Sequence, residues 1–397
     1  MTVAAILARF PSMRALVIGD VCLDRWCRYH PGLAEPSRET AIPRVAVTST
    51  EVTPGAAGTV AANLAALGVG NVSVLGVIGD DGFGWELQRS LAARSISTDL
   101  LIRSPLVSTF TYTKLLNAST GAEDLPRLDF INAAPLDSQL ESQVIDSLRE
   151  KIRDFDVILV SDQAETSAGG VVTAKVREAL ADLGYFGTAT VRERQRWNRT
   201  ATVRERQRWN RTATVRERQR RNRTATVRER QRRNRTATVR ERQPTDDATG
   251  DRNKVIFVDS RARAELFRNV VLKVNRDEAD AACQRIGGDY RALREHTRSK
   301  ILVITRGSGG ALVIGGNNDN ANYETTLPAR RIHHPVDVCG AGDSFSAGAA
   351  MALAVTGSPL EAAQFGNLVA SVTIMKKGTG TATPAELLAA AVNEAHP

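Results

Sequence analysis

The sequence predicts an α/β fold in which a mostly parallel central sheet lies between two layers of helices. From about residue 136 onward, helical and strand-like segments alternate regularly, as they do where crossover helices cover both faces of a parallel sheet. Near the N-terminus, residues 13–19 form an almost unbroken apolar run, which is typical of a strand buried on both sides. The alternation and this strand together predict the fold class.

Two acidic residues follow the first strand. Asp20 and Asp24 would lie at its carboxyl end, where open α/β sheets bind ligands; the alternative is that each caps a helix or a turn. Residues 30–53 contain Pro and short β-prone pieces without a helical period, so we expect a small β flap there. The Gly-rich residues 54–59 then open a helix over 60–67.

The later elements follow from the same periodicity rules. Residues 109–115 alternate like a strand, and a lid built from about 30–53 and 108–130 is expected to cover the ligand site. The other expected elements are strands at 72–76, 127–130, 156–160, 255–259 and 301–305, and helices after 79–84, after 136, at 171–183, at 278–284 and after 343.

The composition is that of a soluble globular protein. Of the 397 residues, 42% are hydrophobic and 24% are charged, and no apolar run is long enough to span a membrane. Residues 1–10 resemble a short amphipathic helix more than a signal peptide, so a cytoplasmic location is expected. The four cysteines form no C-x-x-C pair and the five histidines do not cluster, which argues against structural zinc or a disulfide framework.

A tandem repeat interrupts the alternation. The twelve residues T-A-T-V-R-E-R-Q-R-W-N-R recur from residue 188, and the array breaks off after Gln243. Twelve residues do not return to the same side of a helix, so no apolar stripe forms, and we expect a solvated insertion between 1–187 and 244–397, which would form one domain. The segment holds 20 Arg and 5 Glu, although the whole chain carries a formal charge of only +9. The alternative is an arm that binds nucleic acid or another polyanion.

The most informative stretch is D-V-C-G-A-G-D-S-F at 337–345, which precedes a helix of small apolar residues. The small residues at 340–342 let backbone N–H groups approach a ligand at the positive end of that helix, where anions bind. A kinase needs such donors for the phosphoryl group and also a base for the acceptor hydroxyl, a role that Asp343 fits. The alternative is a Gly-rich turn with an acidic cap.

These pieces together resemble the ribokinase-like (PfkB) sugar kinases. The stretch 337–343 looks like that family's D-[TV]-x-G-A-G-D signature, and N-R-D-E at 275–278 is similar to its N-x-x-E element. T-R-G-S-G-G at 305–310 resembles its nucleotide loop, and G-D-D-G-F-G at 79–84 resembles its G-x-D-x-x-G element. The resemblance covers nearly the whole chain apart from 188–250, and it implies a ribokinase-like three-layer sandwich with a small β lid.

The resemblance also implies a role for individual residues. Asp343 would be the catalytic base, and the amides of Gly340, Ala341 and Gly342 would form the anion hole. The residues expected to bind the nucleotide and Mg²⁺ are Asn275, Arg276, Asp277, Glu278, Thr305, Gly307, Gly310 and Asn367, with Glu278 holding the metal through water. The residues expected to bind the acceptor are Asp20, Asp24, Gly55, Asn63, Lys114 and Arg127, and a monovalent cation is expected near Asp337.

Within the family, several segments are similar to heptose-phosphate kinases, among them G-D-V-C-L-D-R at 19–25 and R-L-D-F at 127–130. The G-G-A-A-N of that branch reads G-A-A-G-T at 55–59, so the acceptor stays open between a heptose phosphate and another sugar. The resemblance implies ATP-dependent phosphorylation of a sugar hydroxyl, and it also implies a homodimer paired through its lids. The rival hypotheses are a kinase of the same fold for a nucleoside or a ketohexose, and a non-catalytic polyanion-binding protein.

Overall fold

The computed structural model describes residues 1–392 except 165, 167, 189–253, 317–321, 331 and 333. Met1–Tyr185 and Lys254–Pro397 form one compact unit, and everything below concerns this unit. The repeat expected at 188–243 lies outside the described residues from 189 onward. In the described part of the chain, no helix is both long and apolar enough to cross a membrane.

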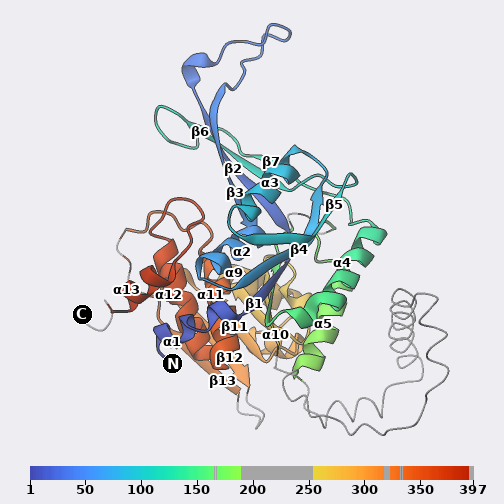
Figure 1. Ribbon diagram of the computed structural model, residues 1–397, viewed down its shortest axis with the longest axis vertical. Coiled ribbons are helices and arrows are strands. Elements are labelled where there is room, and N and C mark those ends of the chain that lie inside the picture. The colour runs from blue at the N-terminus through green and yellow to red at the C-terminus, as the bar shows by residue number, and fades with distance from the viewer. Residues whose placement is uncertain are drawn as a thin grey trace, which may run out of the picture. The chain divides into compact units, whose positions relative to one another are not determined.

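A large twisted sheet forms the centre of the unit (Figure 1). Among the described residues its strand order is β13-β12-β11-β10-β9-β8-β1-β4-β5. Every neighbouring pair from β11 to β5 is parallel, whereas β12 and β13 are antiparallel additions at one edge, which confirms the expected mostly parallel sheet. The strands are β1 (Arg14–Gly19), β4 (Asn71–Gly79), β5 (Ile96–Ser104), β8 (Val157–Asp162), β9 (Val255–Ser260), β10 (Val271–Asn275), β11 (Ile301–Thr305), β12 (Ala311–Gly316) and β13 (Asn322–Leu327).

Helices cover both faces of this sheet, as the alternation predicted. In β1, Ala15 and Val17 point into one hydrophobic cluster while Leu16 and Ile18 point into the other, so the strand is buried on both sides. The helices of the first layer are α1 (Val3–Leu7), α2 (Ala57–Ala66), α3 (Gly82–Ala92), α11 (Ala341–Thr356), α12 (Pro359–Thr373) and α13 (Pro384–Val392). Those of the second layer are α4 (Ser138–Lys151), α5 (Ala174–Thr188), α9 (Arg276–Ile286) and α10 (Tyr290–His296).

A second, smaller sheet has the order β3-β2-β6-β7; its strands β2 and β3 contact α2 and α3 and then extend beyond the helical layers (Figure 1). Its strands are β2 (Val21–Tyr29), β3 (Val47–Ala56), β6 (Thr111–Asn117) and β7 (Leu128–Phe130). Residues 21–29 were not part of the expected flap, yet they form β2 of this sheet. Because β1 ends at Gly19, with φ +142°, and β2 begins two residues later, Asp24 lies on a strand of the small sheet and not at the carboxyl end of β1.

Other elements were also missing from the sequence prediction. β5, β10, β12 and β13 follow closely on other elements, and α10 and α12 are short or dominated by small residues. Their strand and helix signals are short, and pairing with the adjoining strands of the sheet stabilises the four strands.

Candidate active site

A cavity of about 210 Å³ lies between the small sheet and the start of α11. Asp343 and Gly340 come from the helix start, while Asp24 and Lys114 come from strands of the small sheet. The other lining residues are Cys22, Arg25, Trp26, Ala56, Thr59, Tyr112, Arg127, Gln163, Arg261, Cys339 and Thr379. The cavity therefore brings together the motif at 337–345 and the predicted acceptor residues Asp24, Lys114 and Arg127.

Asp343 lies in the first turn of α11 and faces this cavity. Removal from bulk water raises the pKa of its carboxyl to about 7, and the neighbouring carboxylates of Asp259 and Asp24 act in the same direction. Lys273 and Arg261 oppose that rise. A carboxylate with a pKa near neutrality is suited to accept a proton from an alcohol at physiological pH.

The turn before α11 provides backbone donors beside Asp343. Gly340 is the N-cap of the helix with φ +74°, a conformation that strains any residue with a Cβ atom. The N–H group of Ala341 donates to the carbonyl of Val338 at 3.2 Å, and its part in an anion hole stays a prediction. The N–H groups of Gly340 and Gly342 have no acceptor among the described residues and remain available to a ligand.

A buried ion pair lies directly behind this turn. The Nζ atom of Lys273 on β10 is 2.7 Å from a carboxylate oxygen of Asp259 on β9, and the Oγ of Ser346 on α11 donates to the same oxygen at 2.9 Å. A Cβ atom at Gly342 would lie 3.0 Å from that Nζ atom. Burial lowers the pKa of Lys273, but the attraction of Asp259 outweighs it and leaves the pKa raised, so the side chain is charged.

Asp24 is the acidic residue on the opposite wall. Burial raises the pKa of its carboxyl to about 6, against the lowering effect of Lys114 and Arg127. A Cβ atom at Gly55 would come within 2.6 Å of both oxygens of this carboxylate, so the glycine provides the space that Asp24 occupies.

Four cations line the cavity: Arg25, Lys114, Arg127 and Arg261. Lys114 forms an ion pair with Glu123 at 3.4 Å, and Arg127 forms one with Asp129 while its guanidinium lies 4.9 Å from the ring centre of Tyr112. These pairs hold the cations at the cavity edge but leave them partly solvent-exposed, so an anionic ligand could still reach them.

Three of the predicted acceptor residues, Asp20, Gly55 and Asn63, do not line the cavity. Asp20 is 3% exposed, and its two carboxylate oxygens accept the backbone N–H groups of Gln163 and Val171. Asn63 is fully buried on α2, where its side-chain nitrogen donates to the carbonyl of Thr59 at 3.0 Å. Asp20 is inside the protein because it lies in the turn between β1 and β2, and Asn63 is inside because it faces inward from α2. Both carboxylate oxygens of Asp20 thus have structural partners, whereas the buried carboxamide oxygen of Asn63 has none among the described residues.

The N-x-x-E element forms the start of α9. The side chain of Asn275 accepts the N–H of Glu278 at 2.9 Å, and one Glu278 carboxylate oxygen accepts the N–H of Asn275 at 2.7 Å, a reciprocal capping box. Burial and the nearby Asp259 raise the pKa of Glu278. Arg276 and Asp277, between them, are exposed. The motif therefore fixes Glu278 near the Lys273–Asp259 pair, whereas its two central side chains face solvent.

The remaining predicted nucleotide residues lie on two other elements. Thr305 ends β11 and donates to the carbonyl of Val274, and Gly307 and Gly310 follow it in a tight turn with φ values of +55° and +81°. Asn367 lies on α12, where its side chain donates to the carbonyl of Pro328 at 3.4 Å. None of these residues lines the described cavity, so a nucleotide role for them stays a prediction.

Asp337 has two backbone partners. One carboxylate oxygen accepts the N–H of Cys339 at 2.9 Å and the other accepts the N–H of Gly378 at 3.0 Å. This carboxylate thus ties the turn before α11 to the loop after α12. The monovalent cation expected nearby stays a prediction.

Comparison with known proteins gives consistent results. The model of the pfkB carbohydrate kinase family matches residues 15–182 and 254–386. The chain is 28% identical over 392 residues to bifunctional protein HldE of Trichlorobacter lovleyi, covering 98% of this chain and 65% of that protein. It is also 28% identical over 387 residues to bifunctional protein HldE of Geobacter metallireducens, covering 97% and 64%. The chain therefore spans slightly less than two thirds of the length of these relatives.

Solved structures show the same fold. A ribokinase from Thermotoga maritima superposes with a TM-score of 0.59 at 16% identity, covering 95% of this chain and 99% of that one. A putative ribokinase II from E. coli in complex with ATP and Mg²⁺ superposes with a TM-score of 0.57 at 14% identity, covering 96% and 99%. The chain has the ribokinase-like α/β fold, with a large mostly parallel sheet and a second small sheet.

Proposed function

The chain belongs to the pfkB family of carbohydrate kinases, and from this premise we propose that it transfers the γ-phosphate of ATP to a hydroxyl of a phosphorylated sugar. One observation carries the proposal: the Asp343 carboxylate, with a pKa of about 7, faces a cation-lined cavity beside two N–H groups at a helix start. A base for an alcohol and donors for a phosphoryl group are the two parts that this reaction needs side by side.

In the proposed reaction, Asp343 accepts the proton of the acceptor hydroxyl as its oxygen attacks the γ-phosphorus. The bond to the β-phosphate oxygen breaks in line, so ADP leaves with the electron pair. The N–H groups of Gly340 and Gly342 would donate to the equatorial phosphoryl oxygens. Lys273 adds a positive charge behind these donors, where exclusion of water strengthens its effect.

The charge of the cavity supports an anionic acceptor. Arg25, Lys114, Arg127 and Arg261 share its lining with only two carboxylates, those of Asp24 and Asp343. Asp24 is suited to accept hydrogen bonds from sugar hydroxyls, and the cations at the edge are suited to a phosphate group on the same molecule. A heptose phosphate, which the similarity to heptose-phosphate kinases suggests, is the first candidate.

The residues present are compatible with Mg²⁺ bound mainly through water and phosphate. Glu278 uses one carboxylate oxygen for its capping bond and has the other free for a water ligand. The described residues contain no cluster of three or more metal-ligating side chains, and Mg²⁺ with a nucleotide commonly needs only one or two carboxylates. When bound, the ion would neutralise charge on the phosphates, and Glu278 would orient its water.

We also propose that the small sheet mediates a homodimer. Ile42, Val45 and Val47 on and beside β3 are between 45% and 65% exposed, an unusual number of aliphatic side chains for one edge of a sheet. Pairing of two lids would cover them. Light scattering of the purified protein, compared with Val47→Lys, would detect the dimer and its loss.

The first experiment is ATP consumption with a panel of acceptors that contains a heptose phosphate, other sugar phosphates, free ketohexoses and nucleosides. We expect turnover with a sugar phosphate, and a loss of at least about 10³-fold in kcat for Asp343→Asn, which keeps the shape but cannot take the proton. Folding and ATP binding of the variant are the controls. Turnover that survives in Asp343→Asn, or a complete lack of turnover by a folded wild-type protein that binds ATP, would contradict the proposal.

A further inference from the structure

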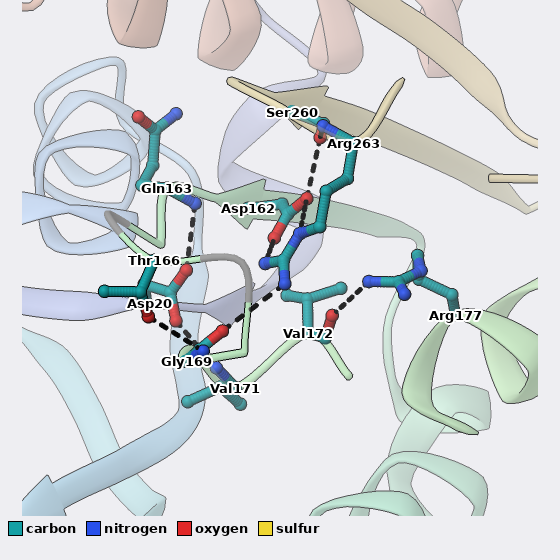
Figure 2. A network of polar contacts seen from close by, with 10 residues as sticks. All are labelled: Asp20, Asp162, Gln163, Thr166, Gly169, Val171, Val172, Arg177, Ser260 and Arg263. Atoms are coloured by element: carbon teal, nitrogen blue, oxygen red, sulfur yellow. Dashed lines mark hydrogen bonds and ion pairs between the residues drawn. The ribbon is translucent and has the colours of Figure 1, made fainter. Parts of the chain in front are cut away.

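The segment between β8 and α5 contributes one residue, Gln163, to the cavity lining. No sequence motif pointed to it. Gln163 follows directly after Asp162, the last residue of β8, and its side chain is half-buried. Among the described residues, none is a hydrogen-bond partner of its carboxamide, which can donate two hydrogen bonds and accept two. In Figure 2 this side chain extends away from the polar network that holds its backbone.

Asp20 fixes both ends of this segment. One of its oxygens accepts the N–H of Gln163 at 2.9 Å, and the other accepts the N–H of Val171 at 2.7 Å (Figure 2). A Cβ atom at Gly170, whose φ is +93°, would lie 3.0 Å from the Asp20 carboxylate, so a glycine permits the close approach. A buried carboxylate that accepts two backbone N–H groups is a rigid support, because losing either bond leaves a buried polar group unpaired.

A second charged group holds the same segment from the other side. The guanidinium of Arg263, after β9, forms an ion pair with Asp162 and donates to the carbonyl of Gly169 at 3.3 Å (Figure 2). Asp162 also accepts the hydroxyl of Ser260 at 2.7 Å. Residues from β1, β8 and the end of β9 therefore hold the segment that begins at Gln163.

We propose that Gln163 binds a hydroxyl of the sugar acceptor through its carboxamide, and that Asp20 is the positioning residue that holds Gln163 in the cavity wall. This inference rests on the proposed function, because it takes the cavity as the acceptor site. It also explains why a buried acidic residue follows β1 although it does not reach the cavity itself.

The test is a double-mutant cycle of Asp20→Asn and Gln163→Ala, assayed with the sugar phosphate that the panel identifies as the fastest acceptor. Gln163→Ala should raise the acceptor KM about tenfold and leave the KM for ATP unchanged. Asp20→Asn should do the same, because an amide presents only one acceptor to two N–H groups. In the Gln163→Ala background, Asp20→Asn should add little to the acceptor KM, since it acts through the side chain already removed.

Glu141→Gln is the matched control. Glu141 is 8% exposed and accepts the hydroxyl of Thr173 at 2.6 Å, so it is a buried acid that supports the adjoining part of the chain away from the cavity. The Glu141→Gln substitution should lower thermal stability without changing the KM for the acceptor or for ATP. If Asp20→Asn does not fold, Gln163→Ala alone still decides the contact with the acceptor.

The possible outcomes distinguish a failure of the role proposed for Gln163 and Asp20 from a failure of the proposed kinase activity. An unchanged acceptor KM in Gln163→Ala, or an equal effect of Asp20→Asn in both backgrounds, would overturn this inference while leaving the kinase proposal intact. A lack of turnover with every acceptor would overturn both.

Discussion

Lys273 places a buried positive charge behind the turn that precedes α11, within 3.0 Å of where a Cβ atom of Gly342 would be. It affects the chemistry in two ways, because it opposes the rise in the pKa of Asp343 and favours negative charge at the neighbouring N–H groups. Asp259 acts on Asp343 in the opposite direction. The protonation of the base therefore depends on a balance between two charges that are paired with each other.

The pH dependence of the wild-type enzyme follows from Asp343. The carboxylate form is the base, so activity requires deprotonation, and a pKa of about 7 means that roughly half of the molecules carry the proton at neutral pH. We expect kcat/KM to rise with pH through about 7 and to fall about tenfold per unit below pH 6. An acid limb centred near pH 4, the range of an ordinary carboxyl group, would contradict this assignment.

Substitutions of Lys273 and of Asp259 should shift the acid limb of the pH profile in opposite directions. Lys273→Met removes the cation and should shift it to higher pH, whereas Asp259→Asn removes the anion and should shift it to lower pH. Lys273→Met should also lower kcat about 10- to 100-fold, because the developing phosphoryl charge loses a cation. A purely structural pair would lower activity in both variants without opposite shifts in the pH profile.

At the scale of single elements, the start of α11 combines strain and function. Gly340 and Gly357 cap the two ends of this helix, with φ values of +74° and +66°. A Cβ atom at Gly340 would lie 3.2 Å from Thr379, which lines the cavity, whereas one at Gly357 would have no neighbour within 4 Å. Both positions therefore have a positive φ, but only at Gly340 would a Cβ atom meet a close neighbour.

This difference gives a matched pair of variants. Gly340→Ala and Gly357→Ala should each cost roughly 1–2 kcal/mol of unfolding free energy, because both force alanine into the left-handed region. Only Gly340→Ala should also reduce kcat, by about tenfold or more, since it displaces the N–H groups beside Asp343. Chemical denaturation and steady-state kinetics measure the two effects separately. Equal kcat values for the two variants would show that the turn does not need its observed geometry.

At the scale of the whole molecule, the functional groups gather at the carboxyl edge of the sheet. Asp20 and Gln163 follow β1 and β8, Arg261 follows β9, and the small sheet lies beside them across the cavity. Val255 begins β9 and therefore lies at the opposite edge of the parallel sheet. The described chain therefore resumes before β9 at a point away from the cavity.

Removal of residues 188–243 tests this placement. We expect the shortened chain to keep its kcat and both KM values within about threefold, because neither junction adjoins the cavity lining. The assay is ATP consumption with the panel acceptor, and circular dichroism checks folding. A folded but inactive product would mean that the repeat takes part in the reaction.

The fold class could be predicted from the sequence, and the chemistry proposed for the loop before α11 rests on a sequence motif. Unbroken apolar strands and regular alternation predicted the parallel sheet, because burial on both faces leaves a local signature in the chain. The motif at 337–343 predicted Asp343 as the base and donors at the helix start, since Gly conformation and helix polarity are also local properties.

The sequence did not indicate which other residues face the cavity, because that depends on how the strands pair. Asp20 was predicted to bind the acceptor but supports Gln163 from inside, and Lys273, on a strand that was not predicted, pairs with Asp259 behind the donor turn. Arg25 lies in a segment similar to heptose-phosphate kinases but no role was predicted for it, and Arg261 and Gln163 belong to no motif. Their roles arise from the turn between β1 and β2 and from strands paired across long sequence separations, and no local pattern in the sequence encodes which side chains those pairings bring together.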